Sequence, residues 1–237
     1  MGVMKPQSRR IIHVGINFVT APPPVIDSRS YLGFQQAILS HGLEFTQVTH
    51  QEKKIIVTRQ VPTALQLTVN VLGPQVGQIL VVAPQPGRSL ELFIQEVEAA
   101  VEAFHATWPA QNRQVIGCDA TLRDLYETTS EHAFQELWEG RLKQSSQSLT
   151  ALGRPVLGGG LRFVMPPLAE EPEPVQIEVK IESFLKDTSK IFVEARFTWT
   201  QPTAPGRLFN PRERLLQVNT YVEDQVVAFI MGGPNDF

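Results

Sequence analysis

Two long amphipathic segments constrain the fold most, because each follows a run of short segments with strand character. Residues 89–108 place apolar side chains at helical spacing behind Ser89, which can cap the helix. Residues 211–231 repeat this pattern behind Asn210, with Pro211 at the first helical position. A helix with one apolar stripe must bury that stripe, and a sheet of alternating strands is the simplest surface for the purpose. The sequence therefore predicts an α+β protein in which helices cross antiparallel sheets.

The order of the predicted elements repeats along the chain. Residues 1–110 read β-α-β-β-β-β-α, and residues 111–237 read β-α-β-β-β-α. A faint echo supports a duplication, because Val14-Gly15-Ile16-Asn17 is similar to Ile116-Gly117-Cys118-Asp119. We interpret the chain as two pseudo-repeated halves, each a curved, mainly antiparallel sheet packed by a long C-terminal helix. The halves form either two domains or one continuous domain.

The alternation of apolar and polar residues gives the strand positions. Strands are predicted at 11–19, 44–49, 53–61, 65–72, 78–83, 113–118, 161–165, 175–184 and 190–200. The basic residues that precede the first strand, Lys5, Arg9 and Arg10, are expected to be a solvated terminus.

Two further helices are predicted from capping residues and spacing. The first begins at Asp27 and ends at Gly42. Its expected buried face comprises Leu32, Gln36, Leu39 and Leu43. The second helix is predicted over 122–142, with an interruption around Thr128-Thr129-Ser130. The acidic residues near its start, where a helix dipole favours negative charge, are Asp119, Asp124 and Glu127.

The segment 175–200 predicts a hairpin whose register can be derived from charge. With Lys186-Asp187-Thr188 as the loop, Lys180 lies opposite Glu194 and Glu178 lies opposite Arg196. A shift by two residues would oppose like charges instead, and cross-strand pairs contribute about 0.2–1 kcal/mol each. The complementary register is therefore predicted.

Composition and motifs exclude several classes of function. The 237 residues carry a net charge of −3, with 42% hydrophobic and 19% charged residues, which is typical of a globular protein without a field to attract nucleic acid. Cys118 is the single cysteine, and no signal peptide or membrane-spanning run is apparent, so we expect a soluble cytoplasmic protein. The triplet Gly158-Gly159-Gly160 precedes a strand, which indicates a bend rather than a phosphate loop. The five histidines lack metal-binding spacing, so we expect neither a metal nor a cofactor.

Two functional hypotheses remain. The first is a non-catalytic protein-binding or scaffold protein, in which Leu208 and Phe209 contact a protein partner or a second copy, or instead pack locally at the start of the last helix. The alternative is an enzyme or small-molecule binder with a site between the halves. The candidate residues for this cleft, which begin or end predicted elements, are His13, Asp119, Arg123 and Arg162. Nucleic-acid binding on the sheet face is less favoured, because phosphate contacts need clustered Lys and Arg.

Overall fold

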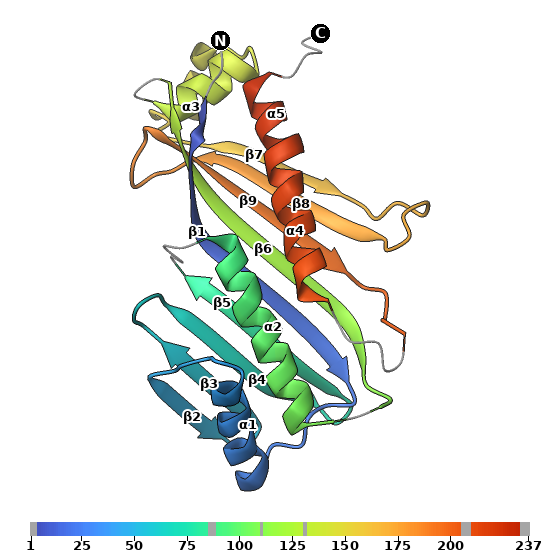
Figure 1. Ribbon diagram of the computed structural model, residues 1–237. Coiled ribbons are helices and arrows are strands. Elements are labelled where there is room, and N and C mark those ends of the chain that lie inside the picture. Colours follow the sequence, from blue (N-terminus) through green and yellow to red (C-terminus); the bar gives the residue numbers. More distant parts are fainter. Residues whose placement is uncertain (1–3, 85–88, 110, 130–131, 205–209, 233–237) are drawn as a thin grey trace.

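The chain forms one antiparallel sheet of nine strands, in the order β2-β3-β4-β5-β1-β6-β9-β8-β7 (Figure 1). The computed structural model describes residues 4–84, 89–109, 111–129, 132–204 and 210–232. The strands are β1 (Met4–Ala21), β2 (Gln47–Gln51), β3 (Lys54–Arg59), β4 (Leu65–Gly73), β5 (Val76–Pro84), β6 (Gln114–Thr128), β7 (Gly160–Met165), β8 (Val175–Ser183) and β9 (Lys190–Trp199). The α-helices are α1 (Ser28–Ser40), α2 (Leu90–Thr107), α3 (Ala133–Gln135), α4 (Pro211–Tyr221) and α5 (Val227–Met231).

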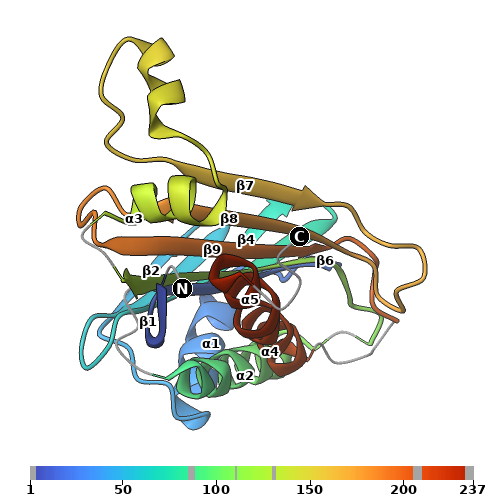
Figure 2. The ribbon, with the colours of Figure 1, turned by 90° about the horizontal axis from the view of Figure 1, so that it is seen from above.

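Most of the helical structure lies on one face of this sheet, which we call the covered face. Figure 2 shows α1, α2, α4 and α5 on the same side of the strands. A π-helical turn, Val222–Val226, joins α4 to α5, so that the two form one continuous rod. The short helix α3 contacts β8 and β9 near one end of the sheet. The opposite side of the central strands, which we call the open face, carries mostly polar side chains.

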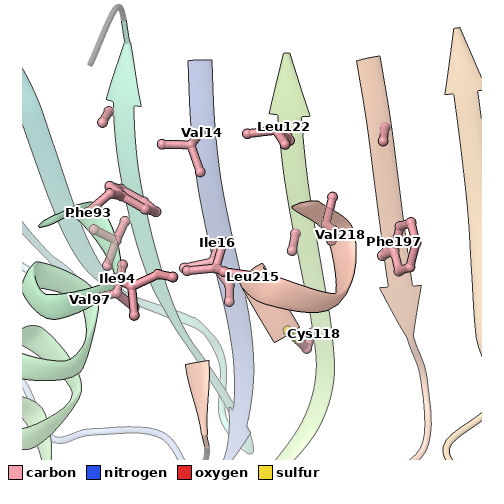
Figure 3. Close-up of a cluster of buried hydrophobic side chains, with 14 of the residues drawn as sticks. Val14, Ile16, Phe93, Ile94, Val97, Cys118, Leu122, Phe197, Leu215 and Val218 are labelled. Atoms are coloured by element: carbon pink, nitrogen blue, oxygen red, sulfur yellow. The ribbon is translucent and has the colours of Figure 1, made fainter. Parts of the chain in front are cut away.

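The covered face holds one hydrophobic core. Figure 3 shows its centre, where side chains of β1, β6 and β9 meet those of α2 and α4. The labelled residues are Val14, Ile16, Phe93, Ile94, Val97, Cys118, Leu122, Phe197, Leu215 and Val218. The two sheets expected from the sequence are joined, because β1 pairs with β6 from Met4–Thr128 to Ala21–Gln114. Strand β7 approaches β8 so closely at Gly160 that the position needs glycine. A Cβ on Gly160 would lie 2.1 Å from the carbonyl oxygen of Ile181.

The two long helices and the 175–200 hairpin are confirmed. Ser89 and Asn210 cap α2 and the α4 rod through their side-chain oxygens, as predicted. In the hairpin, Lys180 pairs with Glu194 and Glu178 with Arg196, which is the predicted register. Glu194, however, is buried by the ion pairs around it although it points away from the core.

The helix predicted over 122–142 is wrong in its first part. Residues 114–128 form the long strand β6, and helical structure begins only at Ala133. Asp119, Asp124 and Glu127 therefore lie on a strand and do not interact with a helix N-terminus. The physical reason is that β6 pairs with β1 on one side and β9 on the other. These two ladders outweigh the helix-like spacing of the apolar residues in this stretch.

The buried face of α1 is also corrected. Phe34 and Ile38 are buried, whereas Leu32 and Leu39 are 59% and 62% exposed. The helix has two apolar faces, and the one with the aromatic ring packs inward, where the Phe34 ring lies 5.0 Å from that of Trp108. The larger side chain gains more from burial, so it determines how the helix is rotated.

The basic start of the chain is solvated only in part, because Lys5 and Arg10 are exposed whereas Arg9 is largely buried. Strand β1 begins at Met4, and the Arg9 guanidinium donates to Asp124 at 2.9 Å, to Asn219 at 2.8 Å and to Glu223 at 2.5 Å. Arg9 therefore ties the first strand to β6 and to the C-terminal rod. Alternation alone does not reveal this role, because every partner of Arg9 is distant in sequence.

Candidate functional site

A hollow of about 370 Å³ lies on the open face, over the centre of the sheet. Its lining comes from β5, β1, β6, β9 and β8, because every second residue of each strand points to this face. The lining residues that point to this face are His13, Gly15, Asn17, Gln78, Leu80, Val82, Asp119, Thr121, Arg123, Glu178, Lys180, Glu194 and Arg196.

One wall of the hollow is uncharged. Gly15 lies between Val82 on β5 and Thr121 on β6 in the strand register. A Cβ built on Gly15 would have Val82 Cγ2 at 3.4 Å and His13 Nε2 at 3.5 Å as its nearest neighbours. The position therefore has room for a small side chain, and its glycine leaves that space empty. Leu80 and Val82 contribute apolar surface beside it.

A chain of hydrogen bonds crosses the hollow from β5 to β9. Gln78 Nε2 donates to Asn17 Oδ1 at 2.9 Å, and Asn17 Nδ2 donates to Asp119 Oδ2 at 3.4 Å. The other oxygen of Asp119 accepts from Thr198 Oγ1 at 2.8 Å and from an Arg196 terminal nitrogen at 2.9 Å. These bonds fix the Asp119 carboxylate and, through it, the Arg196 guanidinium.

The opposite wall is a network of ion pairs. Glu194 accepts from Arg123 Nε at 2.5 Å and from Lys180 Nζ at 2.6 Å. Glu178 accepts two bonds from Arg162 on β7, at 2.9 and 3.1 Å, and lies 3.6 Å from Lys180 Nζ. Lys180 thus links two carboxylates, and the network spans four neighbouring strands.

The network keeps its carboxylates ionised. The hydrogen bonds from Arg162 hold the pKa of Glu178 below its usual value. Burial alone would raise the pKa of Glu194, but the bonds and charges of Lys180 and Arg123 outweigh it and leave that pKa lowered. The bond to Glu194 in turn raises the pKa of Lys180.

The cations of this wall are more exposed than the anions that hold them. The Arg123 side chain is 41% exposed and that of its partner Glu194 is 10% exposed. Arg196 is 53% exposed and Asp119 is 24% exposed. The carboxylates therefore form an inner layer, and nitrogen donors face the solvent.

His13 borders the hollow on β1, opposite Arg123 in the strand register. Burial, followed by the charge of Arg123, lowers the pKa of His13, while Glu194 acts in the opposite direction. The imidazole is consequently neutral at pH 7 and can both donate and accept a hydrogen bond.

The structure brings the predicted cleft residues together. His13, Asp119 and Arg123 line the hollow, and Arg162 reaches its rim by binding Glu178. Leu208 and Phe209, the candidate partner contacts, lie outside the described residues.

The sequence analysis missed four of the charged lining residues as part of a site: Glu178, Lys180, Glu194 and Arg196. Their cross-strand register was predicted, and that register placed them on one outward face. The signal that was missing was the pairing of β6 with β9, which sets Arg123 directly beside Glu194.

Other candidate residues are accounted for elsewhere. Cys118 is buried on the covered face, where burial raises the pKa of its thiol well above the usual value (Figure 3). Across the described ranges, His, Cys, Asp and Glu side chains do not gather in threes at a distance suited to a metal ion. None of the helices in those ranges has the length and apolar character needed to cross a bilayer.

A scan against protein-family models and a search of curated proteins find no match for this chain. Among solved structures, the chain is similar to the crystal structure of DynU16, a protein in the dynemicin biosynthetic locus, at 9% sequence identity and a TM-score of 0.27. The alignment covers 91% of this chain and 96% of that one. A similarity at this level does not extend to function, so the assignment rests on the chain's own residues.

Proposed function

We propose that this protein is a non-catalytic binding protein whose ligand site is the hollow on the open face. The observation that carries the proposal is the convergence of five strands on one hollow that is apolar on one side and ionic on the other. Its volume of about 370 Å³ falls within the range of about 300–1,000 Å³ typical of small-molecule sites. The hydrogen bonds and ion pairs described above hold its polar groups in place before a ligand arrives, which lowers the entropy lost on binding.

Catalysis is the less favoured use of this site. A general acid or base works best with a pKa near the working pH, and a carboxylate tied to two cations is a weak base. The lowered pKa values of Glu178 and Glu194 make both unsuited to that role. Burial lowers the pKa of His13 and leaves its imidazole neutral at pH 7, so an enzyme that used this hollow would depend on His13 as its base.

We further propose that the hollow lies at the junction of two duplicated halves. Counted outward from the centre, the first half runs β1-β5-β4-β3-β2 and the second runs β6-β9-β8-β7, so each half has its last strand beside its first. The sequence echo aligns Asn17 with Asp119, and these two residues are paired directly in the β1–β6 ladder. A two-fold axis through that pair would interchange two other residue pairs, Gly15–Thr121 and Val19–Gly117. Both of these pairs occur in the same ladder.

A pair of matched glycine substitutions tests the site. Gly15→Val fills the empty space at the uncharged wall of the hollow. Gly117→Val is the control, because it places the same side chain on the same face at a position that does not line the hollow. We expect ligands found by screening the intact protein with nuclear magnetic resonance to lose at least about ten-fold in affinity in Gly15→Val and to bind Gly117→Val normally. Equal binding by both variants would contradict the proposal.

A second candidate function, contact with a protein partner or a second copy, is favoured by α1. Leu32 and Leu39 are exposed on its outer side together with Val25, and they line a shallow hollow of about 950 Å³. Exposed apolar groups of this kind mark interaction surfaces. Replacing Leu32 and Leu39 by Ser should lower any self-association measured by light scattering, and the same substitution at Leu208 and Phe209 tests the contact expected there. An unchanged mass in both double variants argues against a second copy as the partner.

Nucleic-acid binding remains the least favoured function. The residues lining the hollow include three acidic side chains and three basic ones. The balance gives little net attraction for a phosphate backbone, which needs clustered basic residues. A cytoplasmic location stays an expectation from the sequence.

A further inference from the structure

We infer that the ligand of the hollow is an amphiphilic anion, with a carboxylate or phosphate group bound by Arg123 and Arg196 and an apolar body resting on Leu80 and Val82. This inference rests on the proposed function and specifies its ligand class. It follows from how the donors, the charges and the apolar surface are distributed across the hollow.

Arg123 and Arg196 have donors to spare. Among the described residues, Arg123 donates through Nε alone, to Glu194, and Arg196 donates through one terminal nitrogen alone, to Asp119. The two terminal nitrogens of Arg123 and two nitrogens of Arg196 are thus available to an anion. Guanidinium groups bind carboxylate and phosphate oxygens in pairs, which is the strongest kind of hydrogen bond available to such a ligand.

These two side chains lie close together on the same face. Arg123 on β6 is opposite Glu194 on β9, and Arg196 is two residues further along β9, opposite Thr121. Arg123 and Arg196 are therefore diagonal neighbours, with backbones about 7–8 Å apart in such a ladder. Both guanidinium groups can reach a single anionic group placed above Thr121.

The inner carboxylates orient the cations without neutralising the surface that a ligand meets. Glu194 and Asp119 are less than half as exposed as the arginines that they hold. Including Arg162 at the rim, the wall has four cations and three carboxylates. A cationic ligand would have to displace Lys180 or an arginine to reach a carboxylate, whereas an anion adds to the outer layer directly.

The body of the ligand is defined by the other wall. Leu80, Val82 and the bare backbone of Gly15 offer apolar contact, and Gln78 and Asn17 are occupied by a hydrogen bond to each other. A group without hydrogen-bonding needs therefore fits this wall best. An aromatic ring or short acyl chain satisfies this condition, and the neutral imidazole of His13 borders the same space.

Small aromatic probes that differ in charge test the inference. Benzoate, phenyl phosphate, benzamide and benzylamine share a ring, and acetate has the charge without the ring. Binding to the full chain is followed at pH 7.5 by the nuclear magnetic resonance signals of the His13 ring and of the Gly15 and Thr121 amides. Benzoate or phenyl phosphate should bind at least about ten-fold more tightly than benzamide, benzylamine or acetate. Benzamide and benzylamine lack the charge-assisted bonds to the arginines, and acetate lacks the apolar contact of the ring.

Two double variants provide the control. Arg123→Gln with Arg196→Gln should remove the preference for the anion. In this variant Glu194 still accepts a hydrogen bond from Lys180, and Asp119 still accepts one from Thr198. Arg29→Gln with Arg154→Gln removes the same charge from exposed positions that do not line the hollow, and should bind like the unchanged protein. An unaltered amide spectrum away from the hollow checks that each variant is folded.

The outcomes separate the inference from the proposed function. If no probe of any charge shifts the signals of the hollow, the proposed function fails, and the inference with it. If benzamide or benzylamine binds as tightly as benzoate and phenyl phosphate, the site binds ligands but the anionic class is wrong. If acetate equals benzoate, the apolar body is wrong. A preference for phenyl phosphate over benzoate, or the reverse, identifies which anion the arginines select.

Discussion

The covered and open faces of the sheet are built from the same strands and differ in almost every physical respect. On β9, Val193, Ala195 and Phe197 enter the core, while Glu194 and Arg196 form ion pairs at the hollow and Thr198 donates a hydrogen bond to Asp119. The covered face gains stability by removing apolar surface from water, whereas the open face uses polar groups that hold one another in place. Under the proposed function, stability and ligand binding are assigned to alternate residues of the same strand.

Neighbouring substitutions on β9 should give the largest contrast. Phe197→Ala removes a ring that is 1% exposed and packs against Trp199 and Tyr221, so the free energy of unfolding should fall by about 3–5 kcal/mol. Thr198→Ala removes one hydrogen bond to Asp119, and the loss should be about 1 kcal/mol. Chemical denaturation measures both values. Similar losses in the two variants would break the contrast between the faces.

A smaller change in stability is expected from Asp124, an acidic residue on the covered face. Burial raises the pKa of Asp124 to about 6, Arg9 opposes this rise, and Glu223 adds to it. In the unfolded chain the pKa is about 4. As pH rises from about 4 to 6, the unfolded carboxyl ionises more readily than the folded one, so the protein loses stability by up to about 3 kcal/mol and does not regain it at higher pH.

The Asp124→Asn variant isolates this contribution. The free energy of unfolding of this variant should lack the decline. The difference in unfolding free energy between the two proteins should therefore change steadily between pH 4 and pH 7, with the unchanged protein becoming less stable relative to the variant as pH rises. Denaturation curves at four or five pH values measure the difference. A constant difference over this interval would mean that Asp124 ionises normally in the folded protein.

The smallest effect is expected at the rim of the open face. Arg162 is exposed, and its bonds to Glu178 are formed in contact with water. Arg162→Gln should therefore change the free energy of unfolding by no more than about 0.5 kcal/mol. A loss above about 2 kcal/mol would show that the open face contributes to stability as the covered face does.

Local patterns predicted the fold where one signal dominated. The hairpin of β8 and β9 was predicted in its register because alternating apolar residues and opposite charges agree there. Residues 122–128 were assigned to a helix because their apolar spacing suits one, whereas the pairing of β6 with strands on both sides makes them extended. In α1, two apolar faces competed, and packing of Phe34 against Trp108 decided between them.

The candidate site was predicted only as separate residues. His13, Asp119, Arg123 and Arg162 were selected because they begin or end predicted elements, yet all four lie within strands. Their proximity follows from the β1–β6 and β6–β9 ladders, which join residues far apart in sequence. Which arginine meets which carboxylate depends on the β6–β9 and β7–β8 ladders and on no local pattern.

The sequence by itself determined which residues alternate, where the long helices start and how the last hairpin is paired. These properties depend on spacing and capping among neighbours, which act before distant segments meet. Only the tertiary structure decided that the strands form a single sheet, that one face is covered, and that the other gathers its charges around a hollow. The reason is that β1 and β6 pair across a hundred residues of chain, and such contacts are selected by the total burial and hydrogen bonding of the whole sheet.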